Sequence, residues 1–244
     1  MYRFSNLAVS FAAFIAVSAP AFAATILIKD AKSQPESLAA APDGTLIVGS
    51  ASTPYVYKLK PGSTTPEVFI DASAEGPGTF FLGQLVDGDT VWSCLLTPVP
   101  GTNQRHTALI GSDLRTGARK LRWNLPGDSN TCNDMAVGPD KALYISDTAN
   151  AKIFRLAPGA QSADLWLENR LVTGIDGLTF FNGVLYYNSV FFNNFYRVPV
   201  DASGKAGTPV QIWMDAPVKG IDGLRVANGK LVQAENGSGK IHML

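Results

Sequence analysis

Five oxygen-bearing side chains recur along this sequence at nearly constant spacing, and each precedes a short apolar segment and a turn. They are Glu36, Gln84, Asn133, Asp176 and Asp222, which gives steps of 48, 49, 43 and 46 residues. Calcium prefers carboxylate and amide oxygens, whereas softer transition metals favour Cys and His. Carboxylates crowded together without a cation would also repel one another. The spacing therefore predicts a divalent cation site if the fold brings the repeats together, although each residue alone also fits a turn or capping role.

The elements that must position these residues are β-hairpins. A repeat of this length, built on a hairpin, is typical of a propeller blade. The first repeat predicts strands at residues 36–41, 45–50, 55–60 and 67–71, and four of the five repeats carry Asp-Gly or Asn-Gly at the first turn. These dipeptides supply the positive φ angles of tight hairpins. We predict an all-β fold, a β-propeller of four-stranded antiparallel blades with five repeats visible, whose first strands place the five polar residues around the mouth of the central tunnel.

The sequence leaves two possibilities for how the ring of blades closes. Residues 25–30 have the pattern of an outermost strand, and the sequence ends at Leu244 after the third strand of the last repeat. The N-terminal strand is therefore expected to complete the last blade, because closure removes exposed sheet edges. The alternative is that a sixth blade is missing.

The first 23 residues have the pattern of a secretory signal peptide. Arg3 precedes an apolar run at residues 7–17, and Ala21-Phe22-Ala23 forms a cleavage site. We expect a mature propeller domain at residues 24–244, exported to a periplasm or secreted, with no membrane span after cleavage; an uncleaved anchor is the alternative. In an oxidising compartment Cys94 and Cys132 are able to form a disulfide, and two buried thiols remain the other interpretation.

Composition and motifs exclude several functions. The chain has 20 basic and 20 acidic residues and only 16% charged residues, so it lacks the basic excess that nucleic-acid binding requires. It contains no Gly-x-Ser-x-Gly element, and His106 and His242 lie outside the repeated inner positions. Covalent nucleophilic catalysis therefore has no support.

Further polar and aromatic residues are expected around the same face. The candidates for substrate binding lie at the ends of second strands or in the loops that follow them: Arg105, Asp147, Asn188 and Phe192. Residues 96–105 form the longest such connection and are a candidate lid. Ordinary turn chemistry and loop packing are the alternatives for these residues.

The motifs resemble those of the regucalcin (senescence marker protein) and gluconolactonase family. The resemblance rests on Pro35-Glu36-Ser37, on Asn133-Asp134 followed by Pro139-Asp140, and on Asp-Gly-Leu at residues 176 and 222, and it covers nearly the whole mature chain. It implies a six-bladed propeller with one divalent cation in the tunnel and hydrolysis of lactones or related esters. The implied metal ligands are Glu36, Asn133, Asp176 and Asp222, with Asp222 as the general base.

One substitution departs from that pattern, since Asp176 stands where the family usually has Asn. The added charge favours Ca2+ as the cation, with Mg2+, Mn2+ or Zn2+ as alternatives. Two other functions remain open. The first is a propeller that binds a ligand or protein without turnover, because this fold supports many functions. The second is a strictosidine synthase-like propeller, for which Glu235 is the unclaimed acid near the same face.

Overall fold

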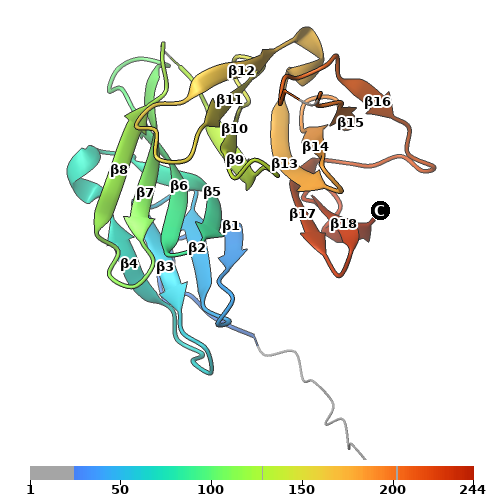
Figure 1. The fold of residues 1–244 in the computed structure, drawn as a ribbon. Coiled ribbons are helices and arrows are strands. Elements are labelled where there is room, and N and C mark those ends of the chain that lie inside the picture. The colour runs from blue at the N-terminus through green and yellow to red at the C-terminus, as the bar shows by residue number, and fades with distance from the viewer. Residues whose placement is uncertain (1–24, 128, 202) are drawn as a thin grey trace, which may run out of the picture.

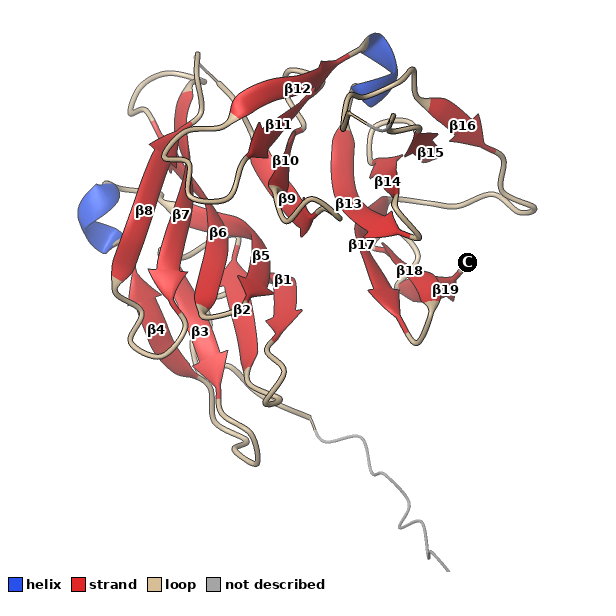
Figure 2. Ribbon diagram, in the orientation of Figure 1, coloured by secondary structure: helices blue, strands red, loops and turns tan. Residues whose placement is uncertain are grey.

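The computed structural model describes residues 25–127, 129–201 and 203–244. The predicted signal peptide lies outside these residues. The regular elements of the described chain are strands and two short 3-10 helices, η1 (Ser73–Glu75) and η2 (Arg170–Val172), joined by loops (Figure 2). None of its helices is long and apolar enough to cross a membrane.

Five sheets follow one another along the chain. The first blade contains β1 (Pro35–Ala40), β2 (Leu46–Ser50), β3 (Tyr55–Leu59) and β4 (Glu67–Asp71). The second contains β5 (Phe80–Asp87), β6 (Thr90–Pro98), β7 (Arg105–Asp113) and β8 (Arg119–Asn124). The third contains β9 (Cys132–Val137), β10 (Leu143–Asp147), β11 (Lys152–Leu156) and β12 (Asp164–Glu168). The fourth contains β13 (Ile175–Phe181), β14 (Val184–Ser189), β15 (Asn194–Val198) and β16 (Val210–Ile212), and the fifth contains β17 (Ile221–Ala227), β18 (Lys230–Glu235) and β19 (Lys240–Met243).

Each sheet is an antiparallel meander, and successive sheets stand side by side around an axis (Figure 1). The first strand of each blade lies innermost, because β5, β9, β13 and β17 each contact the first strand of the preceding blade. This arrangement confirms the predicted propeller of antiparallel blades, with five blades in the described chain. It also confirms that the starts of the innermost strands gather near one axis.

The tight turns between first and second strands form as their sequences predict. At the turns of the fourth and fifth blades, Asn182, Gly183, Asn228 and Gly229 all have positive φ. Asn and Gly tolerate this left-handed conformation better than other residues, so these dipeptides fix the two-residue hairpins.

Apolar cores lie between consecutive blades. Four clusters of buried residues join blade 1 to 2, blade 2 to 3, blade 3 to 4 and blade 4 to 5. The last is the smallest, with Phe195, Leu224 and Leu231 as its buried members. No such cluster joins blade 5 to blade 1 in the described chain, and the arc of blades stays open there (Figure 1).

Glycines at equivalent positions show the same opening. A side chain on Gly83 or Gly177 would collide with the backbone of the next blade. A Cβ atom on Gly223, the equivalent residue of blade 5, would have no neighbouring atom within 4 Å. Beside this opening Leu38 of blade 1 and Ile241 of blade 5 are exposed apolar residues.

The predicted closure by residues 25–30 does not occur. These residues form no strand, and the last sheet has three strands, β17 to β19, in place of the four that were predicted. The segment is held beside blade 1 instead, because Tyr57 Oη donates a hydrogen bond to Asp30 Oδ2 at 2.8 Å. Its apolar residues line the same hollow as Leu46 and Val48 of blade 1, which offers them an apolar surface.

Candidate functional site

A β-bulge at the start of the innermost strand shapes the site in every blade. In blade 1 Pro35 pairs with Ser50 and Leu38 with Val48, so three steps along β1 oppose two along β2. The same shift occurs in the other four blades. A bulge adds a residue to one strand and turns its side chain out of the regular alternation. Bulges at the same point of the five innermost strands therefore bring one bulged residue of each blade near the axis.

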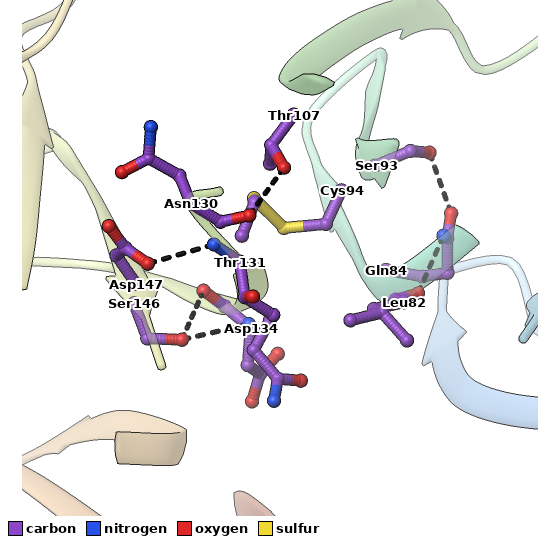
Figure 3. The surroundings of a disulfide bond; sticks show 12 residues. Leu82, Gln84, Ser93, Cys94, Thr107, Asn130, Thr131, Asp134, Ser146 and Asp147 are labelled. Carbon is purple, nitrogen blue, oxygen red and sulfur yellow. Dashed lines mark hydrogen bonds between the residues drawn. A yellow bond between two sulfur atoms is a disulfide. The ribbon is translucent and has the colours of Figure 1, made fainter. Parts of the chain in front are cut away.

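The first bulged residue differs from the predicted one in blade 2. The five residues at this position are Glu36, Leu82, Asn133, Asp176 and Asp222. Gln84, the predicted member of the ring, lies two residues later and is fully buried. Its Oε1 accepts from Ser93 Oγ at 2.7 Å and its Nε2 donates to the Leu82 carbonyl at 3.0 Å (Figure 3). The ring thus has four oxygen-bearing side chains and one leucine.

The four oxygen-bearing ring residues line one cavity of about 360 Å³. Leu38, Val232, Ala234 and Ile241 form its apolar wall beside the open side of the ring. A larger hollow of about 690 Å³ lies on the outer part of blades 3 and 4, but its charged residues Asp140 and Arg155 are already paired at 2.6 Å, and the others, Asp164, Asp201 and Lys205, are exposed. The unpaired acidic groups therefore point to the smaller, axial cavity as the site.

The carboxyl groups of this cavity disfavour one another's ionisation. Burial, followed by the charges of Asp176 and Asp222, raises the pKa of Glu36 to about 9. Burial and the charge of Asp222 raise the pKa of Asp176 well above its usual value, and burial raises the pKa of Asp222. Glu36 Oε2 is buried and has no hydrogen-bond partner among the described residues. Leaving such a group without a partner costs free energy. A proton or a cation bound in the cavity would therefore stabilise it.

Hydrogen bonds orient the neighbouring ligand candidates. Asn133 Nδ2 donates to Asp176 Oδ2 at 3.2 Å and to Thr148 Oγ1 at 3.0 Å, which leaves the amide oxygen Oδ1 on the opposite side of the group. Asp222 accepts from the Gly223 amide at 2.7 Å and from Asn236 Nδ2 at 3.4 Å. Both residues are thus held in place while keeping oxygen lone pairs free.

The donor chemistry fits a hard divalent cation. Every candidate ligand is an oxygen, and the unpartnered Glu36 oxygen belongs to the same cavity as Asp176 and Asp222. Within the described residues, however, no three acidic, His or Cys side chains already stand close enough to hold a metal. Cation binding would therefore require the carboxyl groups to move closer together. The role of these residues as metal ligands remains a prediction.

Two charged residues of the cavity were not among the predicted site residues. Asp134 and Arg225 lie on blades 3 and 5 and form a two-pronged ion pair, with Arg225 Nη1 2.5 Å from Oδ2 and Nη2 2.9 Å from Oδ1. Both line the cavity. The sequence does mark both residues, because each differs in type from the residues at the same position of the other repeats. Asp134 stands where blades 2, 4 and 5 have Gly, and Arg225 stands where the other blades have no charged residue.

The residues predicted to bind substrate lie elsewhere. Asp147 is fully buried, where its Oδ1 accepts from the Thr131 amide at 2.8 Å (Figure 3). Asn188 is also fully buried, and its amide joins the Gly177 amide to the Asp222 carbonyl. Both side chains hold backbone together, because buried amide and carbonyl groups require partners.

The loop residues of that prediction are also absent from the lining of the cavity. Arg105 begins β7, and Phe192 is exposed in the loop between β14 and β15; neither lines the cavity. The expected lid at residues 96–105 is an extended hairpin, since β6 continues to Pro98 and the Val99 amide donates to the Gln104 carbonyl at 2.9 Å. Its apolar and β-branched residues favour strand over open loop.

The two cysteines form a disulfide between neighbouring blades. Cys94 of β6 is bonded to Cys132 of β9, and both are fully buried (Figure 3). Cys94 occupies the middle of the second strand opposite the bulge, as Ser146 and Asn188 do in their blades. Ser146 Oγ donates to the Asp176 carbonyl at 3.1 Å and Asn188 to the Asp222 carbonyl, so this position links each of these blades to the next.

Glu235 does not have the properties of a general acid. Its Oε2 accepts from Ser238 Oγ at 2.8 Å and from the Lys219 amide at 3.3 Å. The hydrogen bond from Ser238 contributes most to lowering the pKa of Glu235. The residue is also absent from the lining of the cavity. These features argue against the strictosidine synthase-like alternative.

Comparison with known proteins identifies the fold. No protein-family model matches the sequence, and no match was found among curated proteins. A proposed gluconolactonase is similar in structure, with a TM-score of 0.65 and 18% identity over 88% of this chain and 75% of that one. A catalytically inactive virginiamycin B lyase from Staphylococcus aureus, solved with quinupristin, has a TM-score of 0.59 and 14% identity over 89% and 83%.

A third solved structure, a protein of unknown function from Bacteroides caccae, has a TM-score of 0.60 and 10% identity over 84% of this chain and 72% of that one. Likeness at these identities establishes the propeller fold that these proteins share with this chain, and function has to be argued from the site itself.

Proposed function

We propose that this chain is an exported, cation-dependent hydrolase of lactones or related esters. The observation that carries the proposal is the buried, unpartnered oxygen of Glu36, which belongs to one cavity with Asn133, Asp176 and Asp222. Those four residues would hold the cation, as their oxygen donors suit Ca2+. A bound cation would supply polarisation of the ester carbonyl and stabilisation of the developing oxyanion.

The remaining steps fall to the residues of this chain. Asp222 is the candidate general base, because its raised pKa makes its carboxylate more basic than an exposed aspartate. The Gly223 amide and Asn236 fix its orientation. Asn133 holds Asp176 by a hydrogen bond of 3.2 Å. Val232 and Ala234 of the apolar wall would limit the number of water molecules around the substrate.

Export is part of the same proposal. The Cys94–Cys132 disulfide supports it, because disulfides persist mainly in oxidising compartments. The signal peptide expected from the sequence is consistent with the same route.

The direct test is metal analysis of purified residues 24–244, with thermal melting and a lactone screen before and after chelation. We expect about one divalent cation per chain, a lower melting temperature after chelation, and hydrolysis that added Ca2+ restores. Asp222→Asn should abolish hydrolysis, whereas Asp164→Asn, an exposed aspartate on β12, should not. Full hydrolysis by Asp222→Asn with its cation still bound would exclude the role given to Asp222.

Two observations favour a second function, ligand binding without turnover. The acidic side chains are not drawn together at metal-binding distances in the described chain, and the cavity has an apolar wall that includes Ile241. A binding protein would show no hydrolysis for a chelator to remove, and its melting curve would not respond to Ca2+.

A further inference from the structure

Arg225 crosses the tunnel to reach a residue 91 positions earlier in the chain. Its guanidinium donates two parallel hydrogen bonds to the Asp134 carboxylate, and Nη1 also donates to the Leu224 carbonyl at 2.8 Å. The Asp134 side chain is nearly inaccessible, whereas 34% of the Arg225 side chain remains accessible. The Arg225 side chain is therefore more accessible than the carboxylate that it binds.

The hydrogen bonds use one edge of the guanidinium and leave the other edge unoccupied. Arginine has five N–H donors in a fixed planar fork. Asp134 and Leu224 take both hydrogens of Nη1 and one hydrogen of Nη2. No acceptor within the described residues takes Nε–H or the second hydrogen of Nη2. These two donors are parallel and lie on the same edge, which matches two oxygens attached to one carbon.

The position of that edge selects the ligand. Arg225 lines the axial cavity together with Glu36, Asp176 and Asp222. A phosphate or sulfate dianion would meet too many carboxyl groups there. A planar O–C–O unit has at most one negative charge, so a lactone, an ester or the carboxylate of a small acid is better suited to both donors.

We propose that Arg225 binds the O–C–O unit of the ligand in the tunnel cavity and that Asp134 is its positioning residue. The binding claim stands on the Arg225 geometry, and the identification of the ligand as the substrate and product of hydrolysis rests on the proposed function. A lactone and the hydroxy acid formed from it share this unit. Substrate and product would therefore use the same two donors.

Binding of defined probes tests the proposal. Calorimetric titration would use δ-valerolactone, 5-hydroxyvalerate and gluconate at millimolar concentrations, with sulfate as the anion control. We expect Arg225→Lys to weaken binding of these probes about 10- to 100-fold, as expected for loss of a two-pronged, charge-assisted hydrogen bond. Lysine keeps the positive charge beside Asp134, so the fold should be preserved. Arg197→Lys, at an exposed arginine on β15, is the matched control and should bind like the wild type.

A second variant guards against damage from an unpaired buried charge. Asp134→Asn combined with Arg225→Gln removes both charges and leaves two amides that are able to bond to each other. This double variant should bind the probes as weakly as Arg225→Lys does. For the positioning role, Asp134→Asn alone should lower kcat of a hydrolysed lactone more than it raises KM, because negative charge develops on the carbonyl oxygen of the O–C–O unit in the transition state and a correctly placed Arg225 interacts with it most strongly there.

The outcomes separate this proposal from the proposed function. Retained Ca2+-dependent melting with lost probe binding in Arg225→Lys supports the assignment of Arg225, since Arg225 is not a cation ligand. Probe binding that depends on Arg225 without hydrolysis or Ca2+ dependence supports the binding site and refutes the hydrolase. Equal behaviour of wild type and both Arg225 variants toward every probe, or wild-type binding of sulfate as tight as that of the acids, overturns the proposal.

Discussion

Replacing Glu36 with glutamine should stabilise the cation-free protein at alkaline pH, although it damages the candidate cation site. The pKa of Glu36 is raised from 4.5 to about 9 in the folded protein. Between these values the folded state keeps a proton that the unfolded state releases, so the free energy of unfolding falls as pH rises. The stabilising contribution is complete below the unfolded pKa and is lost as pH rises through the folded pKa.

The magnitude follows from the proton difference. A difference of one bound proton changes the free energy of unfolding by about 1.4 kcal/mol per pH unit. The largest fall in the free energy of unfolding between pH 5 and pH 8 is therefore about 4 kcal/mol. Asp176 and Asp222 share in the same repulsion, and part of the change therefore belongs to them. We expect a loss of about 2–4 kcal/mol in the wild type and a flatter profile for Glu36→Gln, which has no ionisable group at this position.

Urea denaturation at pH 5 to 8 in the presence of a chelator measures this effect. Glu168→Gln, on the exposed outer strand β12, is the matched control and should follow the wild type. With Ca2+ added, the order should reverse, because the cation binds the ionised carboxylate and binding becomes tighter as pH rises. A cation-free wild type as stable at pH 8 as at pH 5, or a Glu36→Gln protein less stable than wild type at pH 8, would refute the reasoning.

Three further sets of substitutions test the rest of the structure. Replacing both Cys94 and Cys132 with alanine should lower the free energy of unfolding by about 4 kcal/mol, because the disulfide closes a loop with a sequence separation of 38 residues; reduced wild type should denature at the same urea concentration. Asn188→Ala should cost about 2–3 kcal/mol in urea denaturation, since it leaves the Gly177 amide and the Asp222 carbonyl without this partner; a cost below that of an exposed Asn→Ala change would contradict the link between blades. Leu82→Asn should tighten Ca2+ binding in a titration, whereas Gln84→Leu should leave Ca2+ binding unchanged and destabilise the fold by about 1–3 kcal/mol; the opposite pair of results would restore Gln84 to the ring.

The sequence by itself determined the blade architecture. The repeat spacing, the Asn-Gly turns and the alternation of apolar residues are local properties, and each blade is a meander of neighbouring strands. The same local order brought Glu36, Asn133, Asp176 and Asp222 to one cavity, because each stands at the start of an innermost strand. Four of the five predicted ring positions were correct for this reason.

The exact position in blade 2 was decided by pairing between strands. Gln84 follows the sequence pattern of a ring residue, but the bulge adds one residue between Phe81 and Gln84 and places Leu82 there instead. A bulge reverses which face a side chain occupies, and simple alternation in the sequence does not reveal it. The same limit explains why Asp147 and Asn188, which end second strands, turned out to hold backbone groups.

Only the tertiary structure decided the contacts that cross the ring. Arg225 and Asp134 are 91 residues apart and on blades that are not neighbours, so no local pattern pairs them. The side on which the ring stays open was likewise undetermined, because residues 25–30 have a strand-like sequence but are held beside blade 1 through Asp30 and Tyr57. Local sequence sets turns and strands, whereas closure and charge pairing depend on which surfaces meet after the blades have assembled.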